Sequence, residues 1–144
     1  TFRLFDWNRL DTAGQPRPLQ VERGLQAVDW QQGPIDPVTP KPLEMRSSSA
    51  RGQSLLNAPW IRLERYTVES PWVSPYVGEM TVWMVLDGDA ELFDATNWKR
   101  RELPRGSTVL VPAAAGDVVW APKVADSCCT LLAIREPRMR PRSW

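Results

Sequence analysis

The stretch that decides the fold is MTVWMVLDGDAELF at residues 80–93, followed by RGSTVLVPAAAGDVVW at residues 105–120. Both consist of short apolar runs rich in β-branched and aromatic residues, which are typical of strands. Asp87-Gly88 separates two such runs and is a favoured two-residue turn, so residues 80–93 are predicted to form a β-hairpin. Pro112 and Gly116 mark a corner between two further short strands.

Two more strand-like runs flank this region, WIRLERYTVE at residues 60–69 and CCTLLAIRE at residues 128–136. Several closely spaced short strands with turn signals between them predict a mainly β fold, an antiparallel sandwich or barrel over residues 60–137. The basic residues 138–144 are predicted to form a solvated tail. Alternation in the first run places Ile61, Leu63 and Arg65 on one face of its strand, and Arg62, Glu64 and Tyr66 on the other.

Residues 1–59 have a different character. TFRLFDWNRL at residues 1–10 alternates and predicts an opening strand. Val21, Leu25 and Val28 form one helical stripe, which predicts a single helix over about residues 18–30. Residues 31–59 are rich in proline and serine and have few large apolar side chains before Leu55. They predict an extended connector without a core of its own, either a plain linker or a lid.

Composition narrows the classes of function. The chain has 144 residues, with 18 basic and 17 acidic side chains, so its near-zero net charge gives no case for nucleic acid or an anionic membrane as partner. The adjacent Cys128 and Cys129 lie in an apolar run, and we interpret both as reduced core residues of a cytoplasmic protein. The absence of histidine removes the commonest metal ligand and leaves no base for serine catalysis, so no metal or cofactor site is predicted.

Asp87, Asp89 and Glu91 alternate in a way that superficially resembles a calcium loop. That loop needs a longer spacing and ends in a bidentate acidic residue, so the polar face of a hairpin is the better explanation. The eight tryptophans could include sugar-stacking platforms, although core packing accounts for most of them.

The glycine and proline framework of residues 78–120 resembles the two motifs of cupin β-barrels. Gly88 matches the last glycine of the first motif, and Gly106 and Pro112 match the start of the second. In metal-binding cupins these motifs supply histidines and a glutamate. The corresponding positions of this chain fall near Ser74, Tyr76, Thr81 and Val119, so the resemblance implies a jelly-roll barrel without a metal.

The first thirty residues are more specific. They resemble the middle of a class I mannose-6-phosphate isomerase of the short bacterial type, although Gln20 stands where that family has histidine. LPRGSTVLVPAAAGD at residues 103–117 is also similar to the C-terminal barrel of that family. The matching framework residues are Phe2, Arg3, Phe5, Asp6, Trp7, Arg9, Asp11, Gly14, Arg17, Leu19 and Asp29.

The resemblance implies the C-terminal part of an enzyme that interconverts mannose 6-phosphate and fructose 6-phosphate through an enediol, assisted by zinc. The zinc ligands of that family belong to an N-terminal half, which these residues do not include. Arg3 matches an arginine assigned to the active site, where a guanidinium can stabilise enediolate charge or hold substrate oxygens. Asp6 and Arg9 are expected to form a structural ion pair or a strand edge.

Two hypotheses follow. In the first, the chain binds a sugar phosphate and catalyses isomerisation only when the zinc-binding half completes it, so the isolated chain is expected to be inactive. In the second, it is a stand-alone, metal-free cupin-like module that binds a sugar or a partner protein. An open sheet edge would favour self-association, so a homo-oligomer is a further expectation.

Overall fold

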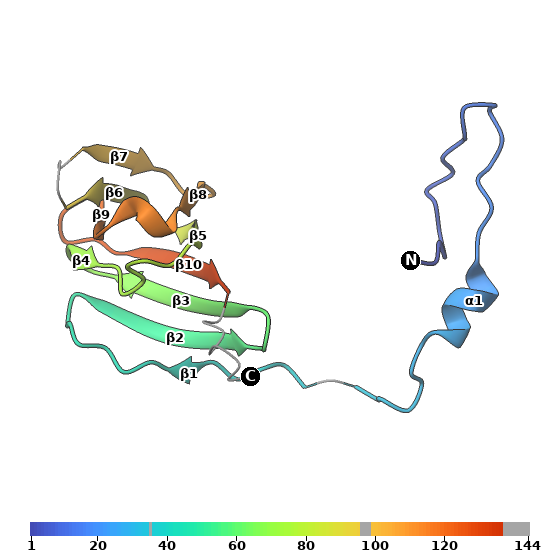
Figure 1. The fold of residues 1–144 in the computed structure, drawn as a ribbon, viewed down its shortest axis with the longest axis horizontal. Coiled ribbons are helices and arrows are strands. Elements are labelled where there is room, and N and C mark those ends of the chain that lie inside the picture. Colours follow the sequence, from blue (N-terminus) through green and yellow to red (C-terminus); the bar gives the residue numbers. More distant parts are fainter. Residues whose placement is uncertain (35, 96–98, 137–144) are drawn as a thin grey trace, which may run out of the picture. The chain divides into compact units, whose positions relative to one another are not determined.

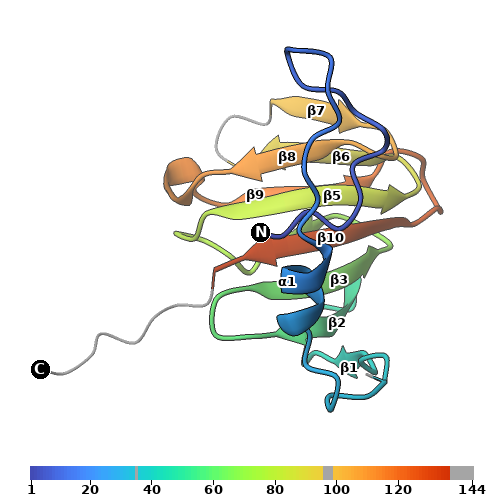
Figure 2. The ribbon, with the colours of Figure 1, turned by 90° about the vertical axis from the view of Figure 1, so that its right-hand side faces the viewer.

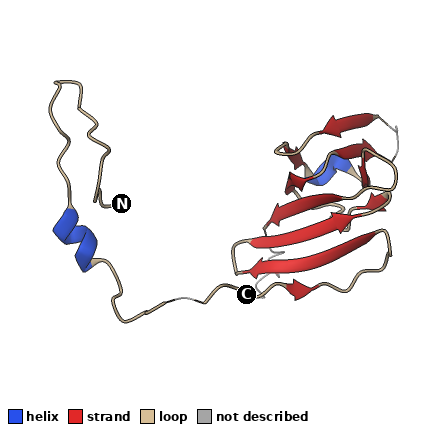
Figure 3. Cartoon of the chain, turned by 180° about the vertical axis from the view of Figure 1, so that it is seen from behind, coloured by secondary structure: helices blue, strands red, loops and turns tan. Residues whose placement is uncertain are grey.

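A computed structural model describes residues 1–34, 36–95 and 99–136, so the predicted tail at residues 138–144 lies outside the described residues. The chain divides into two compact units, Thr1–Pro37 and Val38–Trp144, here called the N-terminal unit and the barrel unit. The α-helix lies in the first unit, and the strands lie in the second (Figures 1 and 3). No helix in the described ranges has the length and apolar character needed to cross a membrane.

The barrel unit consists of two antiparallel sheets (Figure 1). The six-stranded sheet has the order β1-β2-β3-β10-β5-β8, which can be followed from bottom to top in Figure 2, and the four-stranded sheet has the order β4-β9-β6-β7. The strands are β1 (Lys41–Pro42), β2 (Ala50–Asn57), β3 (Arg62–Val68), β4 (Trp72–Val73), β5 (Thr81–Asp87), β6 (Ala90–Asp94), β7 (Arg100–Leu103), β8 (Thr108–Val111), β9 (Val118–Pro122) and β10 (Cys129–Arg135), and a 3-10 turn spans Ala113–Ala115.

Alternation along the three central strands fills the barrel. Burial follows every second residue of β3, β5 and β10, because successive side chains of a strand point to opposite faces of the sheet. The predicted two faces of β3 are therefore confirmed, and the face that carries Glu64 and Tyr66 is the buried one. The main core consists of Ala50, Tyr66, Val68, Trp72, Trp83, Val85, Ala90, Leu103, Val111, Val118, Trp120, Cys129, Leu131 and Ala133.

The predicted hairpin at residues 80–93 is wrong, although both of its strands exist. β5 pairs with β10 and β8 in the six-stranded sheet, whereas β6 pairs with β7 and β9 in the other sheet. Gly88 and Asp89 carry the chain from one sheet to the other. Gly88 has a φ of 67°, and a Cβ at this position would lie 2.5 Å from the carbonyl oxygen of Cys128. A glycine is needed here for both reasons.

Replacing Gly88 with alanine is expected to lower the free energy of unfolding by more than about 1 kcal/mol, because strain at positive φ adds to a backbone clash. Gly106→Ala is the matched control: Gly106 also has a positive φ, of 87°, but no atom lies within 4 Å of the position of its Cβ. Urea denaturation followed by circular dichroism measures both. An equal loss in the two variants would show that the clash with Cys128 has no effect.

The predicted connector over residues 31–59 is also wrong in its second half. β1 and the eight-residue β2 lie within it, and β2 pairs along β3. The sequence did not predict this strand for two reasons. The segment is rich in proline and serine, and the buried positions of β2 carry the small residues Ala50 and Gly52, so no pattern of large apolar residues is present. Pro42 lies on the edge strand, where a missing N–H is tolerated. The boundary between the units therefore follows Pro37, not Pro59.

The N-terminal unit departs from the predicted strand and helix. Residues 1–9 form no strand; Leu10 makes one isolated bridge with Pro16, and Trp7 and Asn8 adopt positive φ angles that break an extended chain. A ladder needs a neighbouring strand, and the described residues of this unit offer none. The helix α1 spans only Val21–Gln26, has no side-chain cap and contains Gly24, which disfavours helix.

The two cysteines differ in environment. Both are free, but only Cys129 is buried, so the prediction that Cys128 is a core residue is wrong. Cys129 belongs to the inward set of β10, and alternation turns its neighbour outward. Burial, together with the adjacent Cys128, raises the pKa of the Cys129 thiol to about 11.

Candidate functional site

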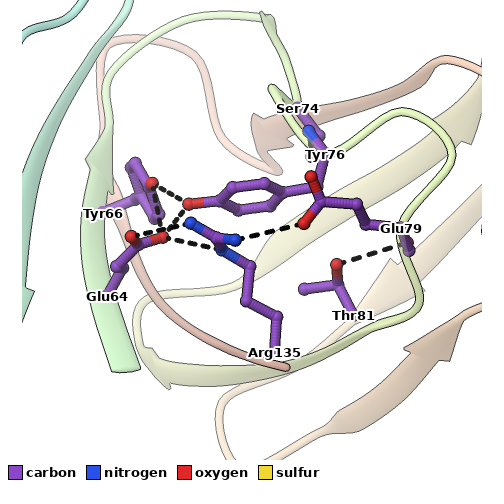
Figure 4. Close-up of polar contacts among 7 residues, drawn as sticks. All are labelled: Glu64, Tyr66, Ser74, Tyr76, Glu79, Thr81 and Arg135. Atoms are coloured by element: carbon purple, nitrogen blue, oxygen red, sulfur yellow. Dashed lines mark hydrogen bonds and ion pairs between the residues drawn. The ribbon is translucent and has the colours of Figure 1, made fainter. Parts of the chain in front are cut away.

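A buried network of charged and hydroxyl groups lies at one end of the barrel. Arg135 ends β10, and the sheet register sets it beside Arg62 at the start of β3 and Thr81 at the start of β5. Inward alternation brings Arg135 to the same side of the sheet as Glu64 and Tyr66. Tyr76 and Glu79 come from the segment between β4 and β5. Figure 4 shows the side chains of Glu64, Tyr66, Tyr76 and Glu79 converging on Arg135.

Arg135 is held between two carboxylates. Its Nη2 donates to Glu64 Oε1 at 3.2 Å and its Nη1 donates to Glu79 Oε2 at 3.1 Å. The guanidinium carbon also lies 4.5 Å from the centre of the Tyr76 ring, which is a cation–π geometry. Only 10% of the Arg135 side chain and 8% of the Glu64 side chain are exposed, so this ion pair is almost entirely withdrawn from water.

Two tyrosines complete the surroundings of Glu64. The Tyr66 hydroxyl donates to Glu64 Oε2 at 3.2 Å, and the Tyr76 hydroxyl donates to the same oxygen. The two hydroxyl oxygens also lie within hydrogen-bond distance of each other, and because each phenol has one proton, the Tyr66 proton is shared between Glu64 and the Tyr76 oxygen. Burial, followed by the negative charge of Glu64, raises the pKa of Tyr66 far above its ordinary value, so this phenol stays protonated and remains a donor. A buried carboxylate with donors on both oxygens is fully compensated.

An open cavity of about 710 Å³ lies against this network. Glu64 and Tyr66 contribute to its wall from β3, and β4 with its flanking residues contributes the segment 71–76. The segment 43–47, which precedes β2, forms the remaining wall. Its lining includes the aromatic rings of Tyr66, Trp72 and Tyr76. The cavity lining is thus mostly apolar and aromatic, with polar side chains at Glu44, Arg46, Ser47, Glu64 and Ser74.

The four positions that the cupin resemblance singled out are not brought together as a set. Ser74 and Tyr76 line the cavity, and the Thr81 hydroxyl donates to the backbone carbonyl of Glu79 at 3.4 Å. Val119 instead packs with Phe93 and Ala121 in a second apolar cluster, separate from the main core. Among the described residues, no three histidine, cysteine, aspartate or glutamate side chains gather closely enough to hold a metal ion.

Arg3 lies in the N-terminal unit and is engaged by its neighbours there. Its Nη1 donates to the carbonyl oxygen of Pro18 at 3.2 Å, and its Nε lies 3.6 Å from Asp6 Oδ1. The backbone N–H of Arg3 donates to Gln20 Oε1 at 2.9 Å, so the Gln20 side chain holds the Arg3 backbone in place.

Asp6 forms the structural ion pair that was expected, but with a different partner. Arg17 donates to both of its carboxylate oxygens, from Nε at 2.6 Å and from Nη2. The hydrogen bond from Arg17 is the largest cause of the lowered pKa of Asp6, and the charges of Arg3 and Arg9 add to it. No contact between Asp6 and Arg9 side chains is found among the described residues, so the Asp6–Arg9 pair is not formed.

Comparison with solved structures identifies the architecture. The mannose 6-phosphate isomerase from Bacillus subtilis superposes with a TM-score of 0.67 at 17% identity, over 93% of this chain and 40% of that one. A cupin superfamily protein from Desulfitobacterium hafniense superposes with a TM-score of 0.50 at 16% identity, over 65% of this chain and 83% of that one. The chain has a cupin-like fold. This confirms the predicted fold class, two antiparallel sheets with one short helix.

Other cupin-like neighbours carry different chemistry. The polyketide cyclase RemF from Streptomyces resistomycificus matches with a TM-score of 0.57 at 17% identity, over 75% of this chain and 80% of that one. No protein-family model matches the chain, and no curated protein sequence matches it. Likeness at this level of identity shows the fold and leaves the activity to be argued from the residues.

The residues that form the buried network were not predicted as a site. Glu64 and Arg135 are 71 positions apart, and neither belongs to a recognised motif. The alternation of β3 correctly placed Glu64 and Tyr66 on one face of the strand. The other face is also partly apolar, so the sequence did not indicate which face is buried. The register of β10 against β3 places Arg135 on the same face as Glu64, and this face is the buried one.

Proposed function

We propose that this chain is the C-terminal portion of an enzyme of the mannose-6-phosphate isomerase type. The observation that carries the proposal is the extent of the match to the Bacillus subtilis isomerase. It covers 93% of this chain, whereas the barrel unit alone holds 107 of the 144 residues, so it includes much of the N-terminal unit as well. The chain spans only 40% of that isomerase, so activity is expected to need further protein.

The surface of the N-terminal unit supports the proposal. Taken by itself, this unit buries only Gly24 among its described residues and leaves large apolar side chains uncovered by its own residues. Burial of so few side chains does not offset the conformational entropy that the segment loses when it is ordered, unless another surface covers its apolar side chains. The exposed side chains are Phe2, Leu4, Phe5, Trp7, Leu10, Leu19, Val21, Leu25, Val28 and Trp30.

Zinc does not fit the residues of this chain. The sequence has no histidine, and the described residues contain no cluster of metal-ligating side chains. In the proposed enzyme the metal ligands therefore come from an N-terminal half, and the contribution of this chain is a guanidinium. Arg3 would hold substrate oxygens or stabilise negative charge on the enediolate, with Gln20 and Asp6 fixing its position. The free thiols agree with a cytoplasmic location.

The proposal predicts the zinc content of the purified chain and the gene sequence that precedes it. The 144-residue chain is expected to bind no stoichiometric zinc in elemental analysis, because it lacks the ligands. The DNA upstream of the Thr1 codon is expected to encode, in frame, a histidine-containing cupin half. A stop codon directly upstream, or one zinc per chain, would contradict the proposal.

A second candidate is a stand-alone, metal-free cupin-like module that binds a small molecule or a partner protein. The observation that favours it is the cavity beside Glu64, which lies wholly within the barrel unit. The upstream sequence separates the two candidates, since a module of this kind needs no zinc-binding half.

A further inference from the structure

The cavity beside Glu64 has a wall built by close packing. A Cβ on Gly52 of β2 would lie 2.8 Å from Tyr66 Cε1, 3.0 Å from Met45 Sδ and 3.2 Å from Leu43 Cδ1. The segment 43–47 is therefore seated directly on β2 and on the Tyr66 ring, because residue 52 has no side chain. The resulting volume of about 710 Å³ is in the range of small-molecule sites.

The negative charge of Glu64 in the wall of the cavity is already neutralised by Arg135. Glu64 is the one buried charged residue that lines the cavity among the described residues, and Arg135 pairs with it through two nitrogens at 3.2 and 3.4 Å. Glu44 and Arg46 line the rim with opposite charges and are exposed to water. An ionic ligand would lose hydration on entering and would meet no deep charge left to compensate it. The site therefore favours an uncharged ligand.

Polar groups without net charge remain available on the floor of the cavity. Ser74, which is 4% exposed, contributes a hydroxyl that accepts the backbone N–H of Tyr76 at 3.3 Å. The Tyr76 hydroxyl already donates its proton to Glu64, so it can offer a ligand only a lone pair of its oxygen. A hydroxyl can both donate and accept, so a ligand hydroxyl fits this floor. Apart from Ser47, whose hydroxyl accepts the backbone N–H of Ser49, the rest of the lining is apolar and aromatic: Leu43, Met45, Pro71, Trp72, Val73 and Pro75.

We propose that this cavity binds an uncharged, predominantly apolar molecule that carries a hydroxyl group, such as a small aromatic alcohol, and that it does not bind a sugar phosphate. A polyol with hydroxyls on every side would leave most of them unpaired against the apolar wall, whereas a single hydroxyl on an aromatic body matches both parts of the lining. This site is independent of the proposed isomerase function, because it lies within the barrel unit and needs neither zinc nor Arg3.

Three probes of one shape test the proposal: benzyl alcohol, benzylamine and benzoate, which are neutral, cationic and anionic at pH 7. Binding to the full 144-residue chain is measured by ligand-observed NMR titration, with mannose 6-phosphate as a fourth probe. Benzyl alcohol is expected to bind saturably and at least about tenfold more tightly than the two ions, with no binding of the sugar phosphate. Absence of saturable binding by benzyl alcohol, or equal or tighter binding of a charged probe, would overturn the proposal.

A pair of surface variants locates the binding. Val73 is 52% exposed and lines the cavity, so Val73→Trp is expected to narrow it and to weaken binding of benzyl alcohol at least about tenfold without disturbing the core. Val124→Trp is the control, since Val124 is 63% exposed and lies outside the cavity lining. Unchanged binding in Val73→Trp would overturn the assignment to this cavity. Failure of the isomerase assay would leave this test unaffected.

Discussion

Replacing Arg135 with methionine is expected to lower the free energy of unfolding of the barrel unit by about 3–5 kcal/mol. Methionine fills much of the same space, so the effect comes from the charges that stay behind. Glu64 would keep the hydrogen bonds from two tyrosines but lose its cationic partner, and Glu79 would lose the bond from Nη1. Removing one member of a buried ion pair leaves the other charge uncompensated in a region of low dielectric constant.

The control for this prediction is Arg51→Met, which removes another arginine–glutamate pair from the six-stranded sheet. Arg51 contacts Glu69, but these side chains are 77% and 45% exposed. Surface pairs contribute about 0–1 kcal/mol, so this variant is expected to unfold close to the wild type. Guanidinium denaturation followed by circular dichroism measures both. A loss below about 1 kcal/mol for Arg135→Met would show that the network is not a structural necessity.

Replacing Trp83 with alanine is expected to cost about 3–5 kcal/mol. Trp83 is fully buried on β5, and its ring centre lies 5.1 Å from that of Trp120, 5.8 Å from those of Tyr66 and Tyr76, and 6.2 Å from that of Trp72. Truncation would leave a cavity in the middle of this aromatic group, lined by large rings that do not readily collapse into it.

Two further variants make the Trp83 prediction specific. Trp60→Ala removes a tryptophan that is 74% exposed and is expected to change stability by less than about 0.5 kcal/mol. Trp83→Phe keeps a ring and removes an indole N–H that has no described partner, so its cost is expected to fall well below that of alanine. Equal unfolding midpoints for Trp83→Ala and Trp60→Ala would contradict the central place of Trp83 in the core.

The strands of the barrel were predictable because each carries its own signal. β3, β5 and β10 alternate, and burial of one face of a strand imposes that pattern on the sequence. The partner of each strand is a different question. Asp87-Gly88 is a favoured turn, so the sequence predicted that β5 pairs with β6. In the structure β5 pairs with β10, and the apolar faces of both strands, with Val85 and Leu131, fill the same core. Strand pairing is decided by long-range packing, which no local pattern records.

Of the residues at the site, only those near the cupin motifs were predicted from the sequence. Ser74 and Tyr76 were singled out through the cupin framework and do line the cavity. Arg135 was not singled out, because the sequence around an arginine at the end of an apolar strand is the same whether its side chain is buried or exposed to water. Its burial depends on Glu64, which alternation placed on one face without indicating that this face is the interior. Small inward residues, such as Gly52, similarly concealed β2 within a proline- and serine-rich segment.

In the N-terminal unit the sequence pattern predicted a strand that the structure does not form. Residues 1–10 have the framework of a strand, but a strand without a neighbour has no ladder to stabilise it. Arg3, which is held by Pro18 and Asp6, and Phe5 and Trp7, whose rings contact each other, are the residues of this unit on which the proposed function depends.

The most direct test of the proposed function is the rate of mannose 6-phosphate formation from fructose 6-phosphate in the presence of zinc. It is measured for the 144-residue chain and for the same chain extended by the protein sequence that its gene encodes upstream of Thr1. We expect no turnover by the chain alone and zinc-dependent turnover by the extended protein, abolished by Arg3→Ala. Turnover by the 144-residue chain, or an extended protein that neither binds zinc nor isomerises the sugar phosphate, would contradict it.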